Sequence, residues 1–75
     1  MTKQELLKEI KNALQRDDDI AEDMELESIE EWDSLAALTL LSLYDQLFSV
    51  TFTMAEIGKC RKVSDLVALV GDKVS

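Results

Sequence analysis

Ser34 is the residue whose type and position suggest chemistry, because it follows Asp33 and precedes Leu35 and an apolar run ending at Phe48. Asp33 is of a type favoured at helix N-caps, so we predict a helix from Ser34 to Phe48, uninterrupted by glycine or proline. A serine in a first helical turn lies beside unpaired backbone amides, at the positive end of the helix dipole. This position suits a phosphate, so Ser34 is a candidate acceptor of a group that another enzyme attaches.

Few other residues could carry out chemistry alone. The chain has no histidine, which excludes histidine-based triads, general bases and zinc sites. Cys60, the single cysteine, has no histidine or second cysteine to act with, so we interpret it as an inert thiol. The acids after Asp17 fail the EF-hand spacing at Ala21 and Glu22. We therefore expect neither an enzyme nor a dedicated metal site.

Length and composition predict a single small domain over residues 1–75, with enough apolar residues to form one core. The N-terminal sequence MTKQELLKEI is charged and amphipathic, unlike a signal peptide. No apolar run reaches the roughly 18 residues that a membrane span requires. We expect a soluble, cytoplasmic protein.

Charge is distributed unevenly along this acidic chain, whose formal net charge is −8. Twelve acids and no Lys or Arg lie between Asp17 and Ile57, and Lys59, Arg61 and Lys62 follow directly. The acidic segment would repel nucleic acid and attract a basic protein surface.

Helical patterns precede and follow a long connection. Thr2 and Glu5 form a capping-box pattern before a helix predicted over residues 3–16. Residues 17–33 carry ten acids and fit neither a helix nor a strand, so we predict a long loop. Scattered apolar residues would pin this loop to the core: Ile20, Met24, Leu26, Ile29 and Trp32.

Two shorter helices follow the helix that begins at Ser34. Thr53 and Glu56 repeat the capping-box pattern and predict one or two turns ending near Gly58. Ser64 is the predicted cap of a last helix over residues 65–73, whose buried side would be Leu66, Val67, Leu69, Val70 and Val74. The expected fold is all-α, a small four-helix bundle with a long first loop and a short third helix.

The helix over residues 34–48 has two faces, and both of them carry leucines. One face carries the stripe that a helix usually buries, formed by Leu40, Leu43, Tyr44 and Leu47. The opposite face carries Leu35, Leu38, Ser42 and Asp45, where nothing obliges the two leucines to be buried. This face is either a contact surface for another protein or a surface that the bundle itself covers.

Taken over nearly its full length, the chain resembles the acyl carrier protein family, whose members are phosphopantetheine-binding carrier domains. The resemblance lies in Asp33-Ser34-Leu35, in LLSLYDQLF followed by VTF, in the short helix around residues 54–57 and in Val63-Ser64-Asp65-Leu66. It implies a four-helix bundle in which Ser34, flanked by Asp33 and Leu35, carries 4′-phosphopantetheine from coenzyme A through a phosphodiester. The group's thiol would hold an acyl or aminoacyl group as a thioester, so the carrier needs no nucleophile or metal of its own.

The resemblance also implies partners: a phosphopantetheinyl transferase, an acyl- or aminoacyl-activating ligase, and acyl-transfer or synthase enzymes with basic docking patches. These enzymes would recognise the start of the second helix through an exposed strip, which we call the contact strip: Asp33, Leu35, Leu38, Ser42 and Asp45. Neither nucleic acid nor membrane is an expected partner.

Two departures from the family pattern favour a specialised carrier over the housekeeping carrier of fatty acid biosynthesis. Glu31 stands where the family often has glycine, and uncharged residues stand where fatty-acid carriers often have acids: Ala36, Thr39, Gln46 and Leu47. The expected function is to shuttle acyl or aminoacyl groups in a lipid, polyketide or specialised pathway. Two alternatives stay open: a stand-alone aminoacyl or peptidyl carrier, and an unmodified acidic helical interaction module in which Ser34 is only structural.

Overall fold

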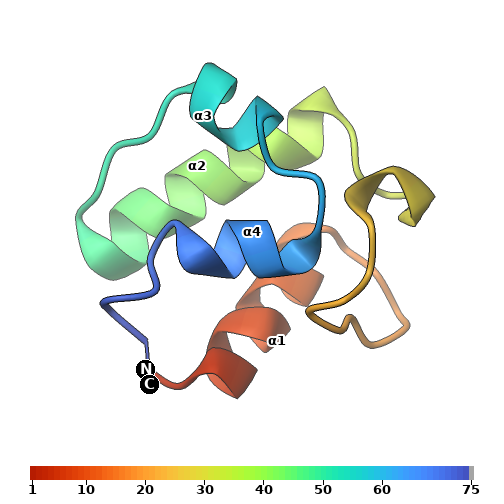
Figure 1. Cartoon of the computed structure of the whole chain (residues 1–75), viewed down its shortest axis with the longest axis horizontal. Helices are drawn as coiled ribbons and strands as arrows, with labels where there is room; N and C mark the ends of the chain where they lie inside the picture. Colours follow the sequence, from red (N-terminus) through yellow and green to blue (C-terminus); the bar gives the residue numbers. More distant parts are fainter. Residues whose placement is uncertain (75) are drawn as a thin grey trace.

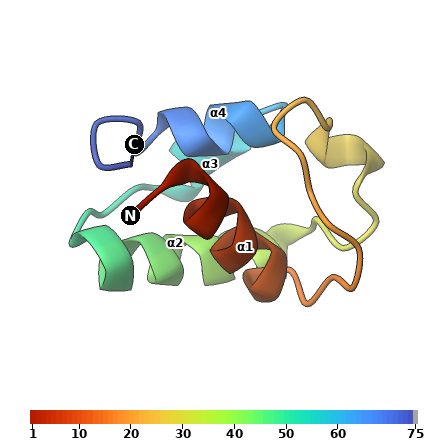
Figure 2. The ribbon, with the colours of Figure 1, turned by 90° about the horizontal axis from the view of Figure 1, so that it is seen from below.

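Four α-helices and one 3-10 turn make up the fold in the computed structural model, which describes residues 1–74 (Figure 1). In chain order they are α1 (Lys3–Ala13), η1 (Leu26–Ser28), α2 (Ser34–Phe48), α3 (Met54–Gly58) and α4 (Val63–Ala68). In Figure 2, α4 and α2 run along opposite edges of the molecule, and α1 crosses obliquely between them. The four-helix, all-α prediction is confirmed, and the described residues contain no strand beyond one isolated bridge between Glu25 and Lys62.

Helix α1 begins as predicted and ends earlier. The Thr2 hydroxyl accepts the Glu5 amide at 3.1 Å, and the Glu5 carboxylate accepts the Thr2 amide at 3.1 Å. The predicted end at residue 16 is wrong, because Gln15 adopts a left-handed conformation with φ 55°. The amides of Gln15 and Arg16 turn back onto the carbonyls of Asn12 and Lys11, which closes α1 at Ala13.

Helix α2 buries part of the predicted stripe. Leu40 and Tyr44 are buried, but Leu43 is half-buried and Leu47, in the last turn, is 37% exposed. The remaining buried positions are Ala36 and Ala37. Their small side chains let the end of α1 and the short α3 approach the start of α2 closely.

The long first connection is pinned to the core, as predicted. Ile20, Leu26 and Ile29 are buried, whereas Met24 and Trp32 are half-buried against the core. Hydrogen bonds also join this connection to residues 61–64, at the start of α4, and both segments lie side by side in Figure 1. The Leu26 amide donates to the Arg61 carbonyl at 2.8 Å, and the Val63 amide donates to the Met24 carbonyl at 3.0 Å.

The C-terminal helices confirm one prediction and correct another. The Thr53 hydroxyl accepts the Glu56 amide at 3.2 Å, and α3 ends at Gly58 as predicted. Ser64 is not the cap of α4, because the helix has already begun at Val63. The Asp65 carboxylate instead accepts the amides of Arg61 and Lys62 at 2.9 and 3.1 Å. These bonds lower the pKa of Asp65.

Past Ala68 the chain continues in turns, so the predicted helix end at residue 73 is wrong. The predicted apolar side is nevertheless the one that faces the core: Leu66, Val67 and Val70 are buried, and Leu69 and Val74 are half-buried.

Tyr44 joins α2 to α4 at the centre of the core. Its fully buried hydroxyl donates to the Leu66 carbonyl at 2.6 Å. That carbonyl belongs to the last turn of α4, where backbone acceptors lack helical partners. The ring also meets Phe48 and Phe52 edge-on, with centroids 5.8 and 6.0 Å away. Burial raises the pKa of Tyr44 well above its ordinary range.

None of the helices within residues 1–74 is long and apolar enough to cross a membrane.

Candidate functional site

Asp33 starts α2 in the way that the sequence predicts. Its backbone is extended, with φ −150°, and its Oδ1 accepts the Ala36 amide at 2.8 Å. Its carbonyl accepts the Ala37 amide at 3.0 Å. The amides of Ser34 and Leu35 have no partner within the helix, because no turn precedes them. These two amides are thus available to an acceptor outside the helix.

Ser34 is the first residue of α2, and its side chain is exposed. The positive end of the helix dipole and the two free amides favour a negatively charged group at this position. An exposed hydroxyl is also accessible to a modifying enzyme. The arrangement can therefore accept a phosphate-linked group and stabilise its charge.

A shallow hollow of about 300 Å³ lies beside Ser34, between the start of α2 and helix α3. Its lining residues come from both helices and from the chain before α2: Trp32, Asp33, Ser34, Ala37, Met54, Ile57 and Gly58. Sequence reasoning did not assign Trp32 or Met54 to the site. Only the predicted short helix after Thr53 could have pointed to Met54, because α3 brings this side chain toward the serine.

The predicted contact strip is exposed along its whole length. Leu35 and Leu38 have 71% and 52% of their surfaces exposed, and Asp33, Ser42 and Asp45 are exposed as well. The spacing of Leu35, Leu38, Ser42 and Asp45 places them along one side of α2, and Asp33 precedes the helix as its N-cap. The bundle does not cover this face, so an apolar strip with a carboxylate at each end faces solvent beside Ser34.

The charged side chains that the sequence groups into an acidic and a basic segment are mostly exposed. Most carboxylates of residues 17–33 are exposed, and Lys59, Arg61 and Lys62 are exposed on the connection before α4. Unlike these three basic residues, Arg16 has a largely covered side chain, and its guanidinium donates to Glu31 at 2.9 Å.

Cys60 is half-buried, and its Sγ lies 3.8 Å from the Glu56 carbonyl oxygen. Burial, with a smaller contribution from Asp65, raises the pKa of this thiol, which disfavours the nucleophilic thiolate.

The residues present fit a phosphopantetheine group. Ser34 offers the hydroxyl, the amides of Ser34 and Leu35 could donate to phosphate oxygens, and the Trp32 and Met54 side chains offer an apolar surface beside them. When bound, the group supplies the thiol that carries the cargo. The chain's own contribution is to present the hydroxyl, favour the negative charge and leave the surroundings open to a second protein.

A family model described as the phosphopantetheine attachment site matches residues 4–70. Searches of curated proteins and of solved structures gave no significant match. Carrier domains of this family are generally non-catalytic and interact with phosphopantetheinyl transferases and biosynthetic enzymes. The match favours the carrier hypothesis over an unmodified interaction module. The chain belongs to the phosphopantetheine attachment-site family and is a carrier protein with a covalently attached 4′-phosphopantetheine group.

Proposed function

We propose that Ser34 is the attachment residue and that residues 1–75 form a single carrier domain. The domain shuttles acyl or aminoacyl groups, held as thioesters, between enzymes of a lipid, polyketide or specialised biosynthetic pathway. The observation that carries this proposal is the exposed Ser34 hydroxyl at the start of α2, with the unpaired amides of Ser34 and Leu35 beside it.

In the attachment step, Ser34 Oγ bonds to the β-phosphorus of coenzyme A. The bond from this phosphorus to the bridging oxygen breaks, and adenosine 3′,5′-bisphosphate leaves with that oxygen. The hydroxyl proton passes to a base on the transferase. Asp33 holds the helix start through its bond to the Ala36 amide, so the Ser34 and Leu35 amides could donate to the phosphate oxygens.

Intact-mass measurement tests this assignment. We expect the purified chain, incubated with coenzyme A and a broad-specificity phosphopantetheinyl transferase, to gain the mass of one phosphopantetheinyl group. Ser34→Ala should gain none. Ser28→Ala, which removes another exposed serine hydroxyl from this part of the chain, should be modified fully. Modification of Ser34→Ala would place the attachment at another residue and overturn the proposal.

Partner enzymes dock on the contact strip of α2 in this proposal. Exposed Leu35 and Leu38 supply apolar contacts, and the surrounding carboxylates attract basic patches. Leu38→Asp should raise the KM of the transferase at least tenfold. Leu47→Asp, which adds the same charge in the last turn of α2 away from the strip, should change it less than twofold. Equal effects of the two variants on KM would show that the transferase does not dock on the contact strip.

The cargo that we propose is a short acyl or an aminoacyl group belonging to a specialised pathway. The hollow beside Ser34 measures about 300 Å³ and opens to solvent, whereas the core beneath it is filled by aliphatic and aromatic side chains. Loading the carrier with an octanoyl or an alanyl group should therefore leave the hydrogen exchange of core amides unchanged. Increased protection of α2 and α4 amides by the octanoyl group alone would favour a fatty-acyl carrier that encloses its cargo.

A further inference from the structure

The chain that leads into α2 has few hydrogen bonds to the rest of the molecule, and within it Trp32 packs against the core. Residues 30–35 lie between buried Ile29 and buried Ala36, and each of them is exposed or half-buried. Their backbone bonds are local: the Trp32 amide donates to Ile29, and Asp33 accepts from the start of its own helix. Among the described residues, the ion pair between Arg16 and Glu31 is their single hydrogen-bonded tie to a distant part of the chain.

Arg16 lies in the turn that follows the end of α1. Its amide donates to the Lys11 carbonyl at 3.2 Å, as part of the turn that closes the helix. The guanidinium is 15% exposed, and its Nη1 donates to Glu31 Oε1 at 2.9 Å. The bond to Glu31 thus extends from the turn after α1 to a residue three positions before Ser34.

The pair joins the two ends of the long acidic connection. Residues 17–30 lie between its partners in the sequence, so a displacement of this segment need not move the start of α2. Arg16 is also the sole basic residue between Lys11 and Lys59. Its guanidinium offsets part of the mutual repulsion among the carboxylates of Glu30, Glu31 and Asp33.

We propose that Arg16 is a positioning residue for Ser34: its guanidinium holds Glu31, and through it the chain entering α2, in the conformation that a phosphopantetheinyl transferase recognises. This inference rests on the proposed attachment at Ser34. Arg16 need not touch coenzyme A or the hydroxyl, because it acts through the backbone between Glu31 and Ser34.

The main effect of the Arg16–Glu31 pair is to position the chain before α2, and its contribution to the stability of the fold is small. Glu31 is 36% exposed, and pairs open to solvent contribute little to folding. The Arg16 Nε is buried without a hydrogen-bond partner among the described residues, which offsets part of the gain from the ion pair. Loss of the pair should therefore loosen the segment before α2 and leave the melting temperature nearly unchanged.

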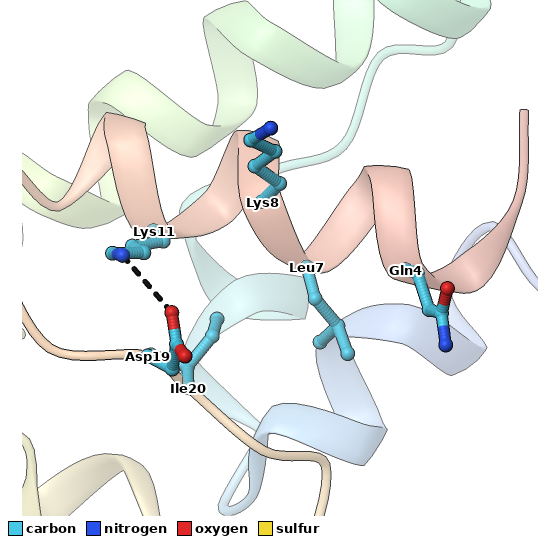
Figure 3. A pocket seen from close by; sticks show the side chains of 6 residues that line it. All are labelled: Gln4, Leu7, Lys8, Lys11, Asp19 and Ile20. Carbon is cyan, nitrogen blue, oxygen red and sulfur yellow. Dashed lines mark hydrogen bonds and ion pairs between the residues drawn. The ribbon is translucent and has the colours of Figure 1, made fainter.

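The test compares two variants that each remove one ion pair of the first connection. Arg16→Gln breaks the pair with Glu31. Lys11→Gln breaks the pair between Lys11 and Asp19, 3.0 Å apart, which holds the start of the same connection (Figure 3). Transferase kinetics with coenzyme A and the melting temperature are measured for both. We expect Arg16→Gln to raise the KM for the carrier about tenfold at unchanged kcat, because fewer molecules hold the recognised conformation. Lys11→Gln should change KM less than twofold.

Reversing the pair separates a positioning role from general damage. Arg16→Glu combined with Glu31→Arg should restore KM to within threefold of the unchanged chain, whereas each single substitution should raise it. If Arg16→Gln does not fold, Glu31→Gln gives the same comparison from the other partner. Equal KM values for the Arg16→Gln and Lys11→Gln carriers, or a fall in kcat and melting temperature without a change in KM, would overturn this inference. An unchanged chain that gains no phosphopantetheine at Ser34 would instead overturn the proposed function.

Discussion

The two halves of α2 make opposite uses of the same helix. The first turns hold exposed Ser34, Leu35 and Leu38, whereas the later turns hold Leu40 and Tyr44, which are 1% and 0% exposed. The later half is tied to α4 through the Tyr44 hydroxyl, whereas the first half is capped by Asp33 and buries only the small side chains of Ala36 and Ala37. The contrast indicates that one half maintains the fold and leaves the other free to present a side chain to other proteins.

Truncating one large side chain in each half tests most directly whether the two halves contribute differently to stability. Tyr44→Ala should lower the free energy of unfolding by about 3–5 kcal/mol, because it opens a cavity among Phe48, Phe52 and α4. Leu35→Ala should change it by less than about 0.5 kcal/mol. Urea unfolding measures both, against a total stability of the order of 4–11 kcal/mol for this length. Similar losses for the two variants would contradict the division of α2.

Removing only the Tyr44 hydroxyl tests how the buried half depends on its hydrogen bond. Tyr44→Phe leaves the Leu66 carbonyl without its partner and should cost about 1–3 kcal/mol at neutral pH. Because burial raises the pKa of Tyr44, its protonated form stabilises the fold below the unfolded-state pKa of about 10. This contribution is lost as the pH rises from there toward the folded-state pKa. Thermal unfolding should therefore show the gap between the unchanged chain and Tyr44→Phe narrowing above about pH 10, and a constant gap would contradict this account.

The cap in the exposed half should have a smaller effect on stability. Asp33→Ala removes the acceptor of the Ala36 amide and should cost about 1 kcal/mol. Asp33→Asn, which keeps a side-chain oxygen at the same place, should cost only a few tenths of that amount. Chemical denaturation of the two variants gives the comparison. A loss for Asp33→Ala as large as that for Tyr44→Ala would mean that the exposed half also maintains the fold.

The smallest expected effect is a gain at the opposite end of α2. Ser49, the C-cap, adopts a left-handed conformation with φ 55° and ψ 38°, which glycine accepts without strain. Ser49→Gly should raise the free energy of unfolding by about 0.5 kcal/mol, and Ser49→Ala should not. Differential scanning calorimetry would detect the difference. A loss of stability with glycine would show that the serine side chain itself stabilises this helix end.

Local patterns predicted the parts of the fold that local chemistry controls. The capping groups of Thr2, Asp33 and Thr53 follow from residue type and spacing, and the three helices they start begin where predicted. The helix ends were less predictable. Gln15 ends α1 in a conformation usually taken by glycine, and α4 is capped from within by Asp65 rather than by Ser64.

The candidate site was predictable where it depends on sequence neighbours and unpredictable where it depends on packing. Ser34 at a helix start and the exposed Leu35 and Leu38 follow from local patterns and from the family resemblance. The positions of Met54 and Arg16 near the start of α2 depend on how distant segments meet. Periodicity within one helix carries no information on such contacts.

The hydrogen bonds between the first connection and residues 61–64 have a consequence for synthesis on the ribosome. Helix α2 emerges before residues 61–64. The backbone groups of the acidic connection that pair with these residues therefore stay without them until they too have emerged. The surroundings of Ser34 are therefore completed late. A transferase that requires the finished bundle would act only after residues 61–64 have left the ribosome and paired with the first connection.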